Sequence, residues 1–182
     1  MAEILMYVLK AFYLILPAYF ANMAPVIGRG IFPRFNIPID FNKKIKGKPI
    51  FGRNKTFRGF IFGILFAVII AYIQYLLFMY GFFRDISIID YSNWLVFGFF
   101  IGFGAMFGDL AESFIKRQLN LKPGARFVPW DQIDYVLGAL LFTDIKFKLD
   151  LPLFISIIVL SFMLHILINH IAFYLKIRKE KW

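Results

Sequence analysis

The sequence predicts an all-α, polytopic integral membrane protein that forms a single domain over residues 1–182. Two observations support this fold class. Hydrophobic residues make up 60% of the chain and charged residues only 18%, and the mean hydropathy is +0.71. Long apolar runs recur along the whole sequence. Because a water-soluble domain cannot bury this much apolar surface, we expect lipid to cover most of it.

Five apolar segments predict membrane-spanning helices at residues 4–27, 57–83, 94–115, 130–143 and 151–175. The first begins near Met1 without a preceding basic region or a following cleavage site, so we expect a retained span rather than a signal peptide. The second follows Asn54 and Thr56, and either of these side chains could cap the start of a helix.

The third segment carries Gly98, Gly102, Gly104 and Gly108, a pattern that favours close packing against neighbouring helices. The fourth is shorter than the ~20 residues that a full membrane crossing needs. The fifth is apolar almost throughout and ends before a basic tail. Five crossings would place the two termini on opposite sides of the membrane.

The positions of Lys and Arg predict the orientation. Of the 21 basic residues, nine lie in residues 29–58, four in residues 116–126 and four from residue 176 onward. The positive-inside rule places these three regions in the cytoplasm and the N-terminus outside. We therefore expect a multi-pass protein of the cell membrane. We expect the basic residues to orient the chain and to bind phosphate groups of its substrates. We expect no nucleic-acid partner.

The acidic residues follow a different pattern. Four of the 11 lie within residues 108–138, with Asp109 and Glu112 at the end of the third segment and Asp131 and Asp134 opening the fourth. Residues three apart share a helix face, so two antiparallel helices would bring all four carboxylates together at the cytoplasmic surface. Charges at this depth carry a desolvation cost, and their placement therefore predicts a functional cation site.

Carboxylate oxygens suit Mg²⁺, which usually takes one or two carboxylates together with substrate phosphates. We predict that Asp109, Glu112, Asp131 and Asp134 supply ligands to Mg²⁺. The neighbouring bases Lys116, Arg117 and Lys122 are then predicted to bind phosphate oxygens. The chain has no cysteine, which excludes disulfides and cysteine-based zinc sites.

A second polar group precedes the second apolar segment. Lys55, Thr56 and Arg58 lie where a helix is predicted to begin, and helix N-termini favour anions. We predict that these three residues bind substrate, with Lys55 and Arg58 beside the phosphate of a lipid.

Three alternatives compete with this interpretation. The carboxylates could simply pair with neighbouring Lys and Arg in ordinary cytoplasmic loops. A transporter or flippase for a phosphorylated lipid or anion could use the same bases without chemistry, although acids hinder anion binding unless a metal is present. A structural membrane subunit would tolerate neutralisation of the acids.

The same stretch resembles the CTP-dependent phosphatidate cytidylyltransferases. The matching residues are Ser113, Lys116, Arg117, Lys122, Pro129, Asp131 and Asp134. Pro123 stands where that family has an acid, and Gln132 stands where it has arginine. With its short five-segment chain, the sequence is more similar to the archaeal branch, the CDP-archaeol synthases, through further motifs at residues 16–25, 38–41 and 55–59.

This resemblance implies that CTP and 2,3-bis-O-geranylgeranylglycerol 1-phosphate give CDP-archaeol and pyrophosphate in an Mg²⁺-dependent displacement. It implies catalytic roles for Lys116, Asp131 and Asp134 and a substrate-binding role for Ser113. Asn22 and the backbone near Gly124 are candidates for reading cytosine. The lipid chains are expected in a groove between Phe-rich spans.

Overall fold

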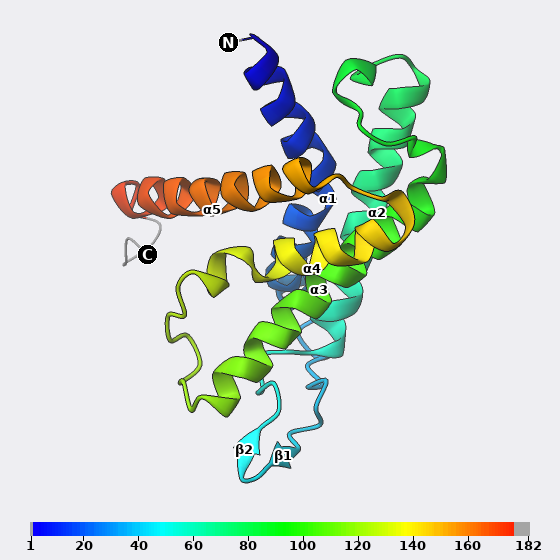
Figure 1. The fold of residues 1–182 in the computed structure, drawn as a ribbon. Helices are drawn as coiled ribbons and strands as arrows, with labels where there is room; N and C mark the ends of the chain where they lie inside the picture. The colour runs from blue at the N-terminus through cyan, green and yellow to red at the C-terminus, as the bar shows by residue number, and fades with distance from the viewer. Residues whose placement is uncertain (1, 177–182) are drawn as a thin grey trace.

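The computed structural model describes residues 2–176, and it consists of five helices, one small hairpin and two short 3-10 turns (Figure 1). The helices are α1 (Ala2–Ile31), α2 (Phe57–Met79), α3 (Trp94–Gln118), α4 (Trp130–Phe147) and α5 (Leu151–Tyr174). The antiparallel hairpin pairs β1 (Lys44–Ile45) with β2 (Lys48–Pro49), and the 3-10 turns are η1 (Arg84–Ile86) and η2 (Tyr91–Asn93). The predicted all-α membrane fold class is confirmed.

Each predicted apolar segment corresponds to one helix. Within residues 2–176, α1, α2, α3 and α5 are long and apolar enough to cross a membrane, whereas α4 is not among them. The second segment was predicted to reach Phe83, but α2 ends at Met79, because Gly81 and Phe83 adopt positive φ angles of 86° and 59°. The orientation, with the N-terminus outside, stays a prediction.

The outer faces of α2 and α5 are apolar. Both helices carry large hydrophobic side chains about half exposed at four-residue intervals: Ile61, Leu65, Ile69 and Ile73 on α2, and Ile155, Val159, Met163 and Leu167 on α5. Residues four apart lie on one helix face, so each helix presents a continuous apolar stripe. Such stripes suit contact with lipid chains rather than water.

The glycines of α3 allow two neighbouring helices to approach closely. A Cβ atom at Gly102 would lie 2.6 Å from the Cβ of Ala67 in α2, and a Cβ atom at Gly108 would lie 2.2 Å from the backbone oxygen of Asp134 in α4. The predicted packing role of these glycines is confirmed. Because Gly104 meets Gly138 while Gly108 meets Asp134, α3 and α4 run antiparallel.

A polar contact between α1 and α2 allows α1 to continue through a proline. Pro17 has no N–H, so the carbonyl of Tyr13, four residues earlier, lacks its helical donor. The side-chain amide of buried Gln74 in α2 donates to this carbonyl at 2.6 Å. The buried carbonyl is therefore satisfied from a neighbouring helix.

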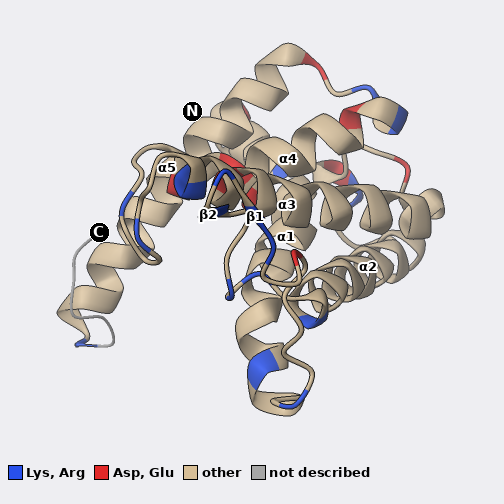
Figure 2. Ribbon diagram, turned by 90° about the horizontal axis from the view of Figure 1, so that it is seen from below, with Lys and Arg blue, Asp and Glu red and all other residues tan. Residues whose placement is uncertain are grey.

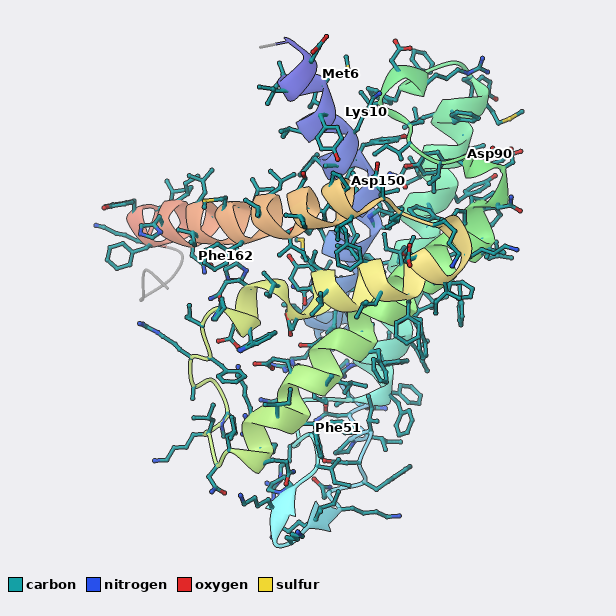
Figure 3. All side chains as sticks on the ribbon, in the orientation of Figure 1. Met6, Lys10, Phe51, Asp90, Asp150 and Phe162 are labelled. Atoms are coloured by element: carbon teal, nitrogen blue, oxygen red, sulfur yellow. The ribbon has the colours of Figure 1, made fainter. Side chains whose placement is uncertain are left out.

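The hairpin closes one end of the helix bundle. In Figure 1, the start of α1 and the turns η1 and η2 lie at the end opposite to the hairpin. The side chain of Lys48 donates to the carbonyl of Gln118, and the amide of Gln118 donates to the carbonyl of Pro49 at 3.3 Å. Phe51, labelled in Figure 3, lies beside α3, with its ring centroid 6.4 Å from that of Phe114. These contacts attach the hairpin to the end of α3.

A single carboxylate organises the loop around the hairpin. Asp40 is buried, and it accepts backbone hydrogen bonds from Asn42 at 2.9 Å, Phe51 at 2.9 Å and Gly52 at 3.0 Å. Burial opposes ionisation of Asp40, but these three hydrogen bonds outweigh it and lower the pKa of the carboxyl. Asp40 therefore stabilises the fold in its ionised form.

This role predicts a pH-dependent loss of stability. Because the folded-state pKa of Asp40 is lowered, its contribution is present above the ordinary value of about 3.9 and is lost as pH falls through the folded-state pKa. We expect Asp40→Ala to lower the free energy of unfolding by about 1–3 kcal/mol at pH 7. Thermal unfolding in detergent between pH 7 and pH 3 measures this difference, which is expected to shrink toward pH 3. Exposed Asp85→Ala is the control, and a difference independent of pH would contradict this role.

Candidate active site

A polar cleft of about 220 Å³ lies where α3, the start of α4 and the segment before α2 meet. We call it the carboxylate cleft. Its lining residues are Asn22, Phe51, Gly52, Arg53, Asn54, Lys55, Asp109, Glu112, Ser113, Lys116, Arg117, Pro123, Gly124, Asp131 and Asp134. Figure 2 shows charged segments gathered beside the hairpin, whereas α2 is almost free of charge along its length. The structure thus brings most of the predicted site residues into one cleft, including Asn22 and Gly124.

The helix geometry explains this convergence. Asp109, Glu112, Ser113 and Lys116 are spaced by one, three or four residues, so they share one side of α3. The first turn and a half of α4 passes in the opposite direction, and its backbone contacts Gly108. The expectation that α3 and α4 bring their two acidic pairs together is confirmed.

Two lysines neutralise three of the four carboxylates. The Nζ of Lys55 lies 2.6 Å and 2.7 Å from the two oxygens of Asp109. The Nζ of Lys116 lies 2.6 Å from Oε1 of Glu112 and also donates to Asp131. Asp131 accepts a further hydrogen bond from the backbone N–H of Phe127 at 2.6 Å. These three carboxylates are therefore paired with nearby bases, as the first alternative interpretation predicts.

Asp134 differs from its three neighbours. Its half-buried carboxylate forms no salt bridge within residues 2–176. Asp109 and Glu112 repel it electrostatically, and Lys55 attracts it from a greater distance than a salt bridge. A partly desolvated carboxylate with two acidic neighbours gains stability from any added positive charge. Asp134 is thus the position at which a cation would have the largest electrostatic effect.

The donor set fits Mg²⁺, although no complete ion cage is formed. Within the described part of the chain, no three His, Asp or Glu side chains are arranged to hold one metal ion. Mg²⁺ does not require such a cage, since it usually takes one or two carboxylates and obtains its remaining oxygens from phosphates and water. Asp134, with Asp131 or Asp109, could supply these carboxylates. The magnesium site stays a prediction.

Thr56 and Lys122 lie outside the carboxylate cleft. The hydroxyl of Thr56 accepts a hydrogen bond from the N–H of Gly59 at 3.2 Å, so Thr56 rather than Asn54 caps α2. Asn54 lines the cleft instead. Lys122 is exposed in the loop after α3. The substrate-binding roles of Thr56 and Lys122 stay predictions.

Arg58 also lies outside the cleft, in a buried position. Its guanidinium donates to the carbonyl of Phe32 and, at 3.4 Å, to the side-chain oxygen of Asn36. These contacts attach the segment after α1 to the first turn of α2. The structure therefore shows a structural role for Arg58, and its predicted contact with a lipid phosphate gains no support from this geometry.

The sequence analysis did not identify Arg53 as a site residue. Gly52 adopts a φ of 93°, which glycine tolerates best, and the chain then runs along the cleft from Arg53 to Lys55. The cleft adjoins a larger cavity of about 660 Å³, which we call the basic vestibule. Its basic residues are Lys44, Lys48, Arg53 and Arg117. Gly52 was the one sequence feature that could have indicated Arg53. Because residues 29–58 contain nine basic residues, the sequence alone did not distinguish Arg53 from the others.

Comparisons with known proteins agree over nearly the whole chain. A family model described as CarS-like CDP-archaeol synthase matches residues 2–182. A protein named CDP-archaeol synthase from Sulfurisphaera tokodaii is 36% identical over 181 residues, covering 98% of this chain and 99% of that protein. One from Archaeoglobus fulgidus is 35% identical over 181 residues, covering 96% of this chain and 98% of that protein. A solved structure of an intramembrane enzyme for archaeal membrane lipids biosynthesis has a TM-score of 0.73 and 26% identity, covering 89% of this chain and 94% of that one.

Proposed function

Because the chain belongs to the CDP-archaeol synthase family, we propose that it transfers CMP from CTP to 2,3-bis-O-geranylgeranylglycerol 1-phosphate with the help of Mg²⁺. The family and the structural match establish the general activity, which is formation of CDP-archaeol by a multi-pass membrane enzyme. The nucleotide, the particular lipid phosphate, the metal and a cytoplasmic active site are the parts that we propose.

One observation carries the proposal: the carboxylate cleft adjoins the basic vestibule. Gly52, Arg53, Asn54, Arg117 and Pro123 line both cavities, so the two cavities adjoin along this segment. A nucleoside triphosphate is strongly anionic, and a cavity lined by Lys and Arg raises its local concentration. Arg53 and Arg117 stand at the boundary, where guanidinium groups can hold phosphate oxygens in bidentate fashion.

The residues of the cleft supply positioning and charge. The ammonium of Lys116 lies between Glu112 and Asp131, where it can donate to phosphate oxygens once it turns from either carboxylate. The lipid phosphate is ionised at neutral pH, so the reaction needs no strong general base. Its oxygen forms a bond to the α-phosphorus of CTP, and the bond from that phosphorus to the pyrophosphate oxygen breaks. Lys116 and Arg117 would neutralise the charge that grows on the departing pyrophosphate.

Mg²⁺, when bound, would supply further charge neutralisation to the phosphate groups. Asp134, Asp131 and Asp109 are the residues that would hold it. Lys55 is paired with the Asp109 carboxylate, so metal binding at Asp109 would require this ion pair to loosen.

The proposal is tested with purified protein, Mg²⁺, the lipid phosphate and CTP labelled at the α-phosphate. We expect labelled lipid and one pyrophosphate for each lipid formed. CTP labelled at the γ-phosphate is the matched control, and its label should leave with pyrophosphate. A transporter or flippase would give neither product, and a rate unaffected by removal of Mg²⁺ with EDTA would overturn the metal requirement alone.

A further inference from the structure

The segment between the hairpin and α2 forms one wall of the carboxylate cleft. All of residues 51–55 line this cleft, and we call them the cleft loop. The cleft loop belongs to no helix or strand of the described chain, so its shape depends on individual hydrogen bonds. Exposed Arg53 and half-buried Lys55 are the cationic residues that it contributes to the cleft.

A buried carboxylate outside the cleft holds this loop. Oδ2 of Asp40 accepts hydrogen bonds from the backbone N–H groups of Phe51 at 2.9 Å and Gly52 at 3.0 Å. Oδ1 of Asp40 accepts another from the N–H of Asn42 at 2.9 Å, so both oxygens are engaged. Asp40 is 5% exposed, and it is not among the residues that line the cleft within the described chain. It therefore acts on the cleft through the backbone of residues 51 and 52.

These hydrogen bonds belong to a closed ring. The carbonyl of Gly52 accepts from the N–H of Lys55 at 3.2 Å, and the carbonyl of Lys55 accepts from the N–H of Ile39 at 2.9 Å. Because Ile39 directly precedes Asp40 in the chain, the ring returns to the carboxylate that binds Gly52. The ammonium of Lys55 extends from this ring and lies 2.6 Å from Oδ1 of Asp109 on α3. The ring thus connects Asp40 to the carboxylates of the cleft.

We propose that Asp40 is a positioning residue, which holds the cleft loop in the shape that directs Arg53 toward the phosphate groups of CTP and Lys55 toward Asp109. This inference rests on the proposed function. A loop that is fixed before the nucleotide arrives loses less conformational entropy on binding. The contribution of Asp40 should therefore appear in the KM for CTP.

The charge of Asp40 makes the direction of this effect informative. Asp40 also lines the basic vestibule, whose Lys and Arg side chains would attract a triphosphate. Removal of a negative charge from this wall would, by electrostatics alone, strengthen that attraction and lower the KM for CTP. Loss of positioning raises the same constant. The sign of the change in KM therefore separates positioning from an effect of charge.

The test measures kcat and the KM for CTP in the labelled-CTP assay at pH 7. Asp40→Ala is expected to raise the KM for CTP about 10-fold, which corresponds to about 1.4 kcal/mol. Gln74→Leu is the control for a merely structural role, because it removes the hydrogen bond to the carbonyl of Tyr13, and Gln74 lines neither cavity in the described chain. Loss of folded protein lowers the apparent kcat, so Gln74→Leu should leave the KM for CTP unchanged. An unchanged or lower KM in Asp40→Ala would overturn the proposal.

Two further variants separate positioning from misfolding. Asp40→Asn keeps one side-chain oxygen that can accept from Phe51 and Gly52, so it should restore part of the affinity for CTP that Asp40→Ala loses. Gly52→Ala disturbs the same turn and leaves Asp40 in place, because Gly52 adopts a φ of 93°, which alanine rarely adopts. A Cβ atom there would lie 3.7 Å from Cδ of Arg117, an ordinary contact, so no clash is introduced. A wild-type KM for CTP in Gly52→Ala would contradict the proposal even where Asp40→Ala does not fold.

Hydrogen exchange tests the loop independently of activity. Amides within residues 51–55 should exchange faster in Asp40→Asn than in the wild type, whereas amides within residues 97–106 of α3 should exchange equally in both proteins. Equal exchange in the cleft loop would rule out the positioning role. Failure of the proposed function would appear differently, as a wild-type protein that forms no labelled lipid from CTP while the difference in exchange persists.

Discussion

Asp134→Asn is expected to lower CDP-lipid formation by at least about 100-fold. Mutation of a residue that only hydrogen-bonds to a metal ligand typically costs about 10–100-fold, and loss of a ligand itself should cost at least as much. The same substitution should leave the protein as stable as the wild type, or more stable. The reason is that the Asp134 carboxylate forms no salt bridge in the described chain and is repelled by Asp109 and Glu112. Replacing it with a neutral amide of the same shape removes that repulsion.

The measurement combines the labelled-CTP assay with thermal unfolding in detergent. Asp85→Asn is the matched control, because Asp85 is exposed in η1 and lies outside the carboxylate cleft. Asp131→Asn gives a useful contrast, since Asp131 accepts hydrogen bonds from Lys116 and Phe127 and its loss should lower both activity and stability. Wild-type activity in Asp134→Asn would show that this carboxylate takes no part in the reaction.

Under the proposed function, Asp134 is a position where folding and catalysis have opposite requirements. Folding alone would favour a neutral residue beside the Asp109 and Glu112 carboxylates, because an unpaired charge that is partly removed from water is costly. A doubly positive ion bound with the nucleotide would reverse this preference. The electrostatic cost is then offset only when the substrate complex is present.

The helices could be predicted from the sequence because their signals are local. Apolar runs identify all five, and the start of α2 at Phe57, of α3 at Trp94 and of α4 at Trp130 agrees with the predicted bounds. The end of α2 was placed four residues too late, since Phe82 and Phe83 continue the apolar run while the backbone has already turned at Gly81. Hydropathy reports lipid preference, and it does not report the φ angles that end a helix.

The candidate site could be predicted only in part. The spacing of Asp109, Glu112, Asp131 and Asp134 was sufficient to bring the two acidic pairs together, because both pairs lie on regular helices. The position of Arg58 depends instead on the path of the segment after α1, which supplies the carbonyl of Phe32. Such tertiary contacts leave no periodic pattern in the sequence.

The second large effect is expected at Lys116. Lys116→Met should slow CDP-lipid formation by about 10²–10³-fold at saturating CTP, the usual cost of removing one group that stabilises developing charge. The Lys116 side chain is 12% exposed and its ammonium pairs with both Glu112 and Asp131, so its removal also leaves two carboxylates without their partner. Breaking a buried ion pair from one side costs about 3–5 kcal/mol, and the activity loss must therefore be separated from unfolding.

The double variant Lys116→Met/Glu112→Gln makes that separation. Removing one carboxylate together with the ammonium restores the local charge balance around Asp131, so the melting temperature should recover toward that of the wild type. Activity should not recover, because no ammonium remains to meet the phosphate groups. The single variant Glu112→Gln is the matched reference, because Glu112 also lines the cleft. Recovery of both quantities would show that Lys116 only balances charge in the folded protein, and recovered stability with activity well below that of Glu112→Gln would show that its ammonium acts on the substrate.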